Sequence, residues 1–149
     1  MAYAALTDLV ARFGEKEMIL LSDDDNTGTI DEAVVDQVLA DVTARIDGYL
    51  TDRYSLPLAQ VPPALVPLAC DLARYLLSTR NGRTRPTEAI KERYDDALTW
   101  LGKVAEGKYG LGLTATEQEI PETGGPQFVA ERRIFTRRTL HDYVRPPRW

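Results

Sequence analysis

The sequence predicts a mainly α-helical protein, with a small domain like a four-helix bundle and an extended C-terminal arm. Apolar residues recur at helical spacing in several segments before residue 107, and glycines and prolines then interrupt any periodicity. The last two dozen residues mix aromatic side chains with arginines. We therefore expect a helical domain at 1–108, an irregular loop at 109–127 and an arm at 128–149. Residues 128–136 of the arm are candidates for a short β-strand or hairpin.

The N-terminal region predicts a short helix from Thr7 to Phe13, whose first two residues can cap it. Gly14 follows, where a left-handed stop costs little. A second short apolar patch runs from Met18 to Leu21. The stretch from Ser22 to Thr29 is polar and rich in aspartate, which predicts a loop.

The strongest helical pattern runs from Asp31 to Leu50. Thr29 and Glu32 have the spacing of a capping box. At 1.5 Å per residue the helix would be roughly 30 Å long. Its expected buried face is formed by Val35, Val38, Leu39, Val42, Ile46, Tyr49 and Leu50.

Prolines then end this helix, and two further helices are expected after them. The third runs from near Pro63 or Pro67 to about Leu77, and the fourth from about Thr87 to Glu106. A basic, glycine-containing connection at 81–86 separates them. Two long and two shorter amphipathic helices can bury one another's apolar stripes as a bundle.

Composition restricts the class of protein. The 44% hydrophobic content is typical of a globular chain. No segment has the roughly 20 apolar residues of a membrane span, and the N-terminus lacks a secretory-signal pattern, so we expect no membrane association. Cys70 is the only cysteine, which excludes an intrachain disulfide. A net charge of −5 argues against a general nucleic-acid binder.

Charge is distributed unevenly along the chain. Residues 131–149 contain six arginines and two acids, a local charge of +4, so residues 1–130 carry −9. The 23 residues from Gln127 to Trp149 could reach about 75 Å when extended, against a radius of gyration of roughly 15 Å for the body. The arm can therefore leave its own domain.

The arm also has the residue types enriched in protein interfaces, aromatics and arginine. We expect it to dock on a neighbouring subunit or on a different protein; the alternative is a hairpin folded back on its own bundle. The expected partner-binding residues are Phe128, Arg132, Arg133, Ile134, Phe135, Arg137, Arg138, Leu140, Tyr143 and Trp149.

One motif resembles the start of a calcium-binding loop. With Asp23 as position 1, Asp25, Thr27, Gly28 and Asp31 fall at positions 3, 5, 6 and 9. Position 12 should be a bidentate glutamate and is Val34 instead. We therefore favour a solvated turn near the positive end of the following helix. A calcium-binding helical module remains a competing hypothesis of a different class.

Other chemistry is poorly supported by the sequence. His141 is the only histidine and lies in the arm, where it makes a poor fixed base for Cys70. Cys70 falls beside an apolar helix face and is expected to be a small core residue. We expect no enzyme, no cofactor and no metal site. A third hypothesis is a small regulator whose arginine arm contacts DNA phosphates.

Four segments carry a resemblance to a known family. The chain opens with Tyr-Ala-x-x-x-Asp-Leu, and an acidic loop precedes the long helix. Asp-Gly-Tyr-Leu then leads into Arg-Tyr-x-Leu-Pro-Leu at 47–58, and Phe135-Thr136-Arg137-Arg138-Thr139-Leu140 follows late in the chain. With these segments the chain resembles the family of phage Mu-type head-tail junction proteins.

The resemblance implies a virion protein of a tailed bacteriophage, made in the host bacterial cytoplasm and located at the head-tail junction. Similar adaptor proteins are helical and form rings, usually twelvefold, beneath the portal. By the same resemblance the arm would face the portal, with neighbouring copies and the next neck or tail protein as further partners and DNA passing through. A stopper or tail-completion ring remains the alternative. The resemblance also implies a structural corner formed by Arg53, Tyr54, Leu56 and Pro57.

Overall fold

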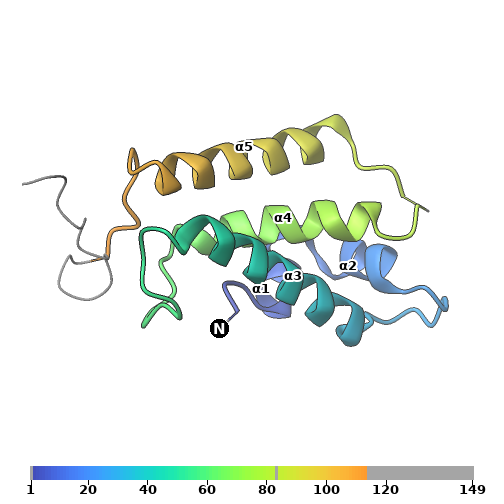
Figure 1. The fold of residues 1–149 in the computed structure, drawn as a ribbon. Coiled ribbons are helices and arrows are strands. Elements are labelled where there is room, and N and C mark those ends of the chain that lie inside the picture. Colours follow the sequence, from blue (N-terminus) through green and yellow to red (C-terminus); the bar gives the residue numbers. More distant parts are fainter. Residues whose placement is uncertain (1, 83, 114–149) are drawn as a thin grey trace, which may run out of the picture.

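The structure, a computed structural model, describes residues 2–82 and 84–113, and these ranges contain five α-helices (Figure 1). This confirms the mainly α fold. The expected arm and most of the loop before it lie outside the described residues. The helices are α1 (Leu6–Phe13), α2 (Glu15–Ser22), α3 (Glu32–Leu50), α4 (Leu65–Thr79) and α5 (Glu88–Ala105).

Helix α4 lies at the centre of the arrangement. It packs against both α3 and α5, and these two also contact each other. Helices α1 and α2 contact α3 and α4 on the side away from α5 (Figure 1). The long helices α3, α4 and α5 therefore form the body of the bundle, and the two short helices cover one flank.

The core follows the apolar stripes that the sequence predicts. In α3 every residue of the expected face is buried except Tyr49, which is partly buried. Leu72 of α4 and Leu101 of α5 are completely buried between the long helices. Full burial of such a side chain contributes roughly 1.5–3 kcal/mol, so this shared core is what holds the helices together. Leu111, beyond α5 and inside the predicted 109–127 loop, also joins the core at 6% exposure.

The short apolar patch after Gly14 belongs to a complete helix, α2, which is longer than the pattern from Met18 to Leu21 suggests. Gly14 alone joins it to α1 and adopts φ +85°, a conformation that glycine tolerates best. Its N–H donates to the Val10 carbonyl at 2.9 Å, and its own carbonyl accepts from Met18 at 3.3 Å. One residue thus ends one helix and begins the next.

The predicted cap of α3 was wrong, whereas Asp8 takes part in the cap of α1 as expected. At α3 the N-cap is Asp31, whose carboxylate accepts from the Val34 N–H at 3.2 Å, so Thr29 and Glu32 form no capping box. Aspartate is at least as good an N-cap as threonine, and it stands one residue before the helix. At α1 the N-cap is Ala5, and the Asp8 carboxylate accepts from its N–H at 2.9 Å.

The structure shows where α4 begins relative to the prolines near its start. It starts at Leu65, two residues before Pro67. The N–H groups of a first helical turn have no partner inside the helix, so proline loses no hydrogen bond there. Pro67 therefore lies within α4 without interrupting it.

Candidate interaction surfaces

The described residues contain no group of three or more His, Cys, Asp or Glu side chains that could hold a metal ion. None of the helices in those ranges combines the length and apolarity that a membrane span requires. Cys70 is completely buried in α4, and burial raises the pKa of its thiol to about 11. Cys70 is therefore a small core residue, as its place beside an apolar helix face predicts. His141 lies outside the described residues.

The aspartate-rich loop is organised by its own hydrogen bonds. The two carboxylate oxygens of Asp23 accept from the backbone N–H groups of Thr27 and Gly28, at 2.9 and 2.7 Å. These bonds hold the pKa of Asp23 below its usual range. Asp24 instead pairs with Arg80 at 2.7 Å, just after α4. The loop is thereby attached to the end of α4.

The four residues expected to form a structural corner lie in the turn directly after α3. Tyr54 is 1% exposed, and its hydroxyl accepts a long hydrogen bond of 3.4 Å from the Leu111 N–H. The Arg53 guanidinium lies 6.0 Å from the centre of the Tyr54 ring. Leu56 packs against the core, whereas Pro57 is exposed and follows a cis peptide bond.

This corner joins two parts of the chain that are distant in sequence. A Cβ atom on Gly107, just after α5, would lie 2.1 Å from an Arg53 guanidinium nitrogen, so the two residues are in close contact. Tyr54 and Leu111 make a second connection. Both lie at the end of the bundle where the described chain stops at Leu113 (Figure 1). The corner therefore fixes the point from which residues 114–149 continue.

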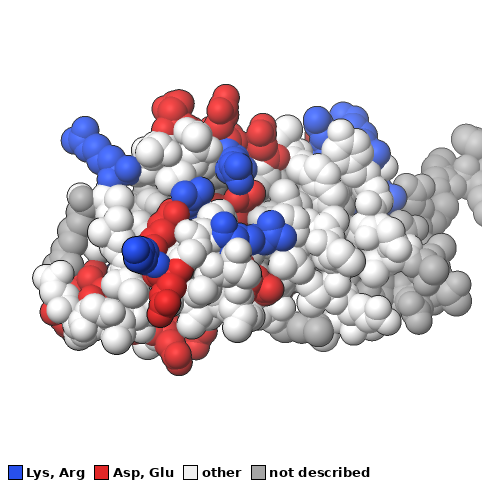
Figure 2. Space-filling view, turned by 180° about the vertical axis from the view of Figure 1, so that it is seen from behind, with Lys and Arg blue, Asp and Glu red and all other residues white. Residues whose placement is uncertain are grey.

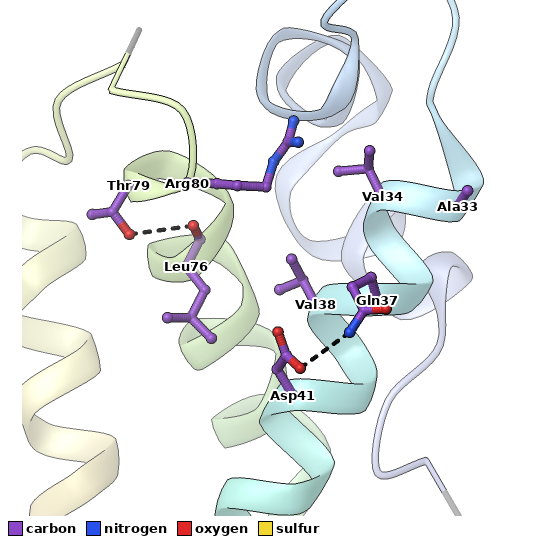
Figure 3. Close-up of a pocket in the computed structure, with 8 residues that line it drawn as sticks. All are labelled: Ala33, Val34, Gln37, Val38, Asp41, Leu76, Thr79 and Arg80. Carbon is purple, nitrogen blue, oxygen red and sulfur yellow. Dashed lines mark hydrogen bonds between the residues drawn. The ribbon is translucent and has the colours of Figure 1, made fainter.

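A groove runs between α3 and α4 near the opposite end of the bundle (Figure 3). Its volume is about 560 Å³, within the roughly 300–1,000 Å³ of typical ligand sites. Val34, Val38 and Leu76 provide apolar surface, and Asp41 projects from α3 toward α4. We call this the α3/α4 groove; it is lined by Ala33, Val34, Gln37, Val38, Asp41, Leu76, Thr79 and Arg80.

The polar side chains of the α3/α4 groove differ in whether they already have ion-pair or hydrogen-bond partners. Arg80 is held by Asp24, and the Thr79 hydroxyl donates to carbonyls of its own helix. The Asp41 side chain accepts one hydrogen bond, from the Gln37 amide at 3.2 Å. Asp41 is exposed, so its carboxylate can accept from an incoming donor.

A second groove, about 530 Å³ in volume, lies between the N-terminal segment and α3. Small side chains dominate it, and Asp36 and Asp47 provide its charge. Its lining is formed by Ala2, Ala4, Ala5, Leu6, Asp36, Leu39, Ala40, Thr43, Ala44 and Asp47.

Among the long helices of the described body, α3 is the most acidic. Helix α3 contains four carboxylates and one arginine. Acidic side chains also project from α5 along the upper edge of the molecule (Figure 2). The half of that face nearest the end of the described chain is largely uncharged (Figure 2). The other half of that face carries acidic and basic side chains next to one another (Figure 2).

The expected partner-binding residues of the arm lie outside the described residues, so their role stays a prediction. Helical periodicity did not predict either groove, because each is formed by elements that periodicity does not place next to each other. The alanines at positions 2, 4, 5, 40 and 44 were the available signal for the second groove. The pairing of Asp24 with Arg80 had no such signal.

Known proteins resemble this chain along most of its length. The family described as Bacteriophage Mu, Gp36 matches residues 3–130. Gene product J of Escherichia phage Mu is 37% identical over 123 residues, which cover 82% of this chain and 84% of that protein. The Mu-like prophage FluMu protein gp36 of Haemophilus influenzae is 30% identical over 142 residues, which cover 95% and 98%.

Proposed function

This chain belongs to the Bacteriophage Mu Gp36 family, and we propose that it is a structural virion protein at the head-tail junction of a tailed phage. In this proposal it forms a ring as a connector or adaptor subunit, attaches to the portal protein and lines part of the DNA conduit. The next neck or tail protein would bind below it. The protein performs no catalysis in this role.

The observation that carries the proposal is the separation of charge between the body and the C-terminal segment. Residues 1–130 carry −9, whereas residues 131–149 carry +4. Subunits of a ring meet through two different surfaces, so each subunit needs a pair of complementary faces. Opposite charges on the body and on residues 131–149 meet this need.

The acidic helices support the conduit part of the proposal. Phosphates of passing DNA are repelled by carboxylates, so an acidic wall does not hold the duplex. Helix α3 provides four such carboxylates against one arginine, whereas the four carboxylates of α5 are accompanied by three lysine or arginine side chains. A cryo-EM map of particles is expected to show this chain in a ring next to the portal with acidic side chains toward the lumen; a basic lumen contradicts this part.

The decisive experiment removes residues 128–149 from the chain in a phage that depends on it. We expect the truncated protein to keep its helical circular dichroism spectrum but to be missing from purified particles. As a milder variant, Arg137→Glu reverses one charge in the arm, and Arg85→Glu reverses one exposed charge on the body as its matched control. Normal incorporation of the truncated protein would contradict a role of the arm as the anchor.

A stopper or tail-completion ring is the nearest alternative position in the same particle. Both positions require ring assembly, and they differ in which neighbour the chain contacts. Cross-linking in intact particles to the portal protein favours the adaptor position. Cross-linking only to tail proteins favours the alternative.

A further inference from the structure

We propose that the α3/α4 groove receives the C-terminal segment, residues 128–149, of a second copy of this chain. The proposal deepens the proposed function and rests on it in one respect, because a ring brings a second copy alongside. It identifies the surface that receives the C-terminal segment. Neither membership of the family nor the corner residues identify that surface.

The first argument is the position of the groove relative to the exit of the chain. Groove residues Val34 and Arg80 lie near the start of α3 and just past the end of α4. The described chain stops at Leu113, at the opposite end of the bundle (Figure 1). Head-to-tail contacts require two different surfaces on each molecule and form a ring when the rotation between neighbours closes. A donor segment and an acceptor groove at opposite ends of the bundle provide two such surfaces.

The second argument is reach. The residues between Leu113 and Phe128 can span roughly 45 Å at about 3.3 Å per residue. The distance along α3 from the corner to the groove is about 20 Å at 1.5 Å per residue. A linker of about 45 Å can therefore deliver the segment to a groove at this distance, on an adjacent body or on its own, and the trapping experiment distinguishes the two.

The third argument is complementary chemistry. The groove offers apolar surface from Val34, Val38 and Leu76, with the exposed Asp41 carboxylate beside it (Figure 3). The C-terminal segment has aromatic and aliphatic residues next to arginines, and its local charge is +4 over residues 131–149. An arginine can bond a carboxylate while a neighbouring aromatic side chain fills an apolar groove.

Two prolines near the C-terminus add to this argument. Pro146 and Pro147 stand between Arg145 and Arg148, and Trp149 follows. Proline has little conformational freedom to lose on binding, so a segment that contains it docks at a lower entropic cost.

The test is disulfide trapping between two populations of the full-length protein. One population contains Ala33→Cys in the groove, and the other contains Leu140→Cys or Val144→Cys in the segment. Cys70 remains in place, because its completely buried thiol with a raised pKa does not react in the folded protein. Thr99→Cys, exposed on α5, replaces Ala33→Cys in the control population.

After mixing under mild oxidation, we expect a disulfide-linked dimer with Ala33→Cys in clear excess over the Thr99→Cys control. Asp41→Arg in the groove population should reduce the trapped dimer by roughly fivefold, because it replaces an attraction with a repulsion. Asp96→Arg on α5 is its matched control and should leave trapping unchanged.

Two results overturn the proposal. One is no dimer above the control, which means that another surface or another protein receives the segment. The other is a fast-migrating monomer from an Ala33→Cys, Val144→Cys double variant with no mixed dimer, which means that the segment folds onto its own body. The truncation experiment measures incorporation into particles, whereas disulfide trapping measures contact between two copies. Failure of the trapping experiment therefore does not imply failure of the proposed function.

Discussion

The hydroxyl of Tyr3 donates a short hydrogen bond to the Asp47 carboxylate, joining the start of the chain to the last turns of α3. Tyr3 is 4% exposed and belongs to the core. Both residues lie in segments that carry the resemblance to phage Mu-type proteins, Tyr3 in the first and Asp47 in the third. The two segments therefore act together, fixing the residues before α1 against α3.

Tyr3→Phe should destabilise the protein by about 1 kcal/mol, because it leaves the partly buried Asp47 carboxylate without its partner and keeps the ring in place. Urea unfolding followed by circular dichroism measures this difference. Tyr49→Phe is the control, since the Tyr49 hydroxyl makes no hydrogen bond among the described residues and its ring is also partly buried. Equal losses in the two variants would contradict the assigned role of the bond.

The same pair predicts a pH dependence. Burial, and then the hydrogen bond and the charge of Asp47, raise the pKa of Tyr3 above its ordinary value. The unfolded chain loses this proton near pH 10 while the folded protein keeps it. Stability from Tyr3 is thus complete below about pH 10 and falls as the pH rises further. The stability difference between the wild type and Tyr3→Phe should narrow above pH 10, and a constant difference would contradict the cause given.

The ion pair between Arg74 and Glu17 should contribute measurably to stability. Two bonds of 2.7 and 3.0 Å join the guanidinium to the carboxylate, and the side chains are only 21% and 28% exposed. Arg74 also lies over the Phe13 ring, 4.5 Å from its centre. A double-mutant cycle of Arg74→Ala and Glu17→Ala should give a coupling energy of about 1–2 kcal/mol.

The matched control for that cycle is the pair of Lys108 and Glu106. Their charged atoms are 2.6 Å apart, closer than in the α4–α2 pair, but both side chains are more than half exposed. Water and salt screen such a pair, so its coupling should be too small to measure. Comparable coupling in the two cycles would show that burial is not what distinguishes them.

The sequence predicted the helices well, because each buries one stripe at a regular spacing. The α3 stripe from Val35 to Leu50 is the clearest example. The sequence pattern did not predict the buried face of α2. Leu20 is part of its apolar patch yet 69% exposed, because a short patch does not define which face of a helix turns inward. The cap of α3 was also mistaken, because several polar residues within a turn of one another compete for the same N–H groups.

The candidate surfaces were much harder to predict than the helices. The α3/α4 groove depends on how Val38 and Leu76 are placed by helix packing, and neither residue differs in type from its buried neighbours. The corner is a contrasting case. Arg53 and Tyr54 were identified through a resemblance, but their contacts with Gly107 and Leu111 arise only when α5 folds back beside α3.

Gly107→Ala should destabilise the protein by roughly 1–2 kcal/mol, because φ is +78° and alanine is strained there. The added methyl group must also displace the Arg53 guanidinium. Gly28→Ala is the control at nearly the same φ, +77°, with no atom within 4 Å of the added carbon. Thermal unfolding should show a larger loss for Gly107→Ala, and equal losses would mean that Arg53 moves aside without cost.

Calcium should produce no saturable heat in a calorimetric titration of this protein at micromolar to millimolar metal, roughly the range in which calcium modules bind. The reason lies in bonds that already exist. Both Asp23 oxygens accept backbone N–H groups of the loop, and Asp31 caps α3 through the Val34 N–H. A cation would have to break these bonds, and Val34 offers no side-chain oxygen at position 12.

Asp23→Asn sharpens this comparison, because it weakens the bonds that hold the loop while lowering its negative charge. If the loop is a self-bonded turn, the variant should unfold at a lower temperature and calcium should affect neither protein. A calcium-binding module would respond differently, since calcium would raise the unfolding temperature of the wild type and Asp23→Asn would abolish that rise. A calcium-dependent rise that Asp23→Asn abolishes would contradict a purely structural role of the loop. The reason is that a ligand that binds the folded state raises the stability of the protein.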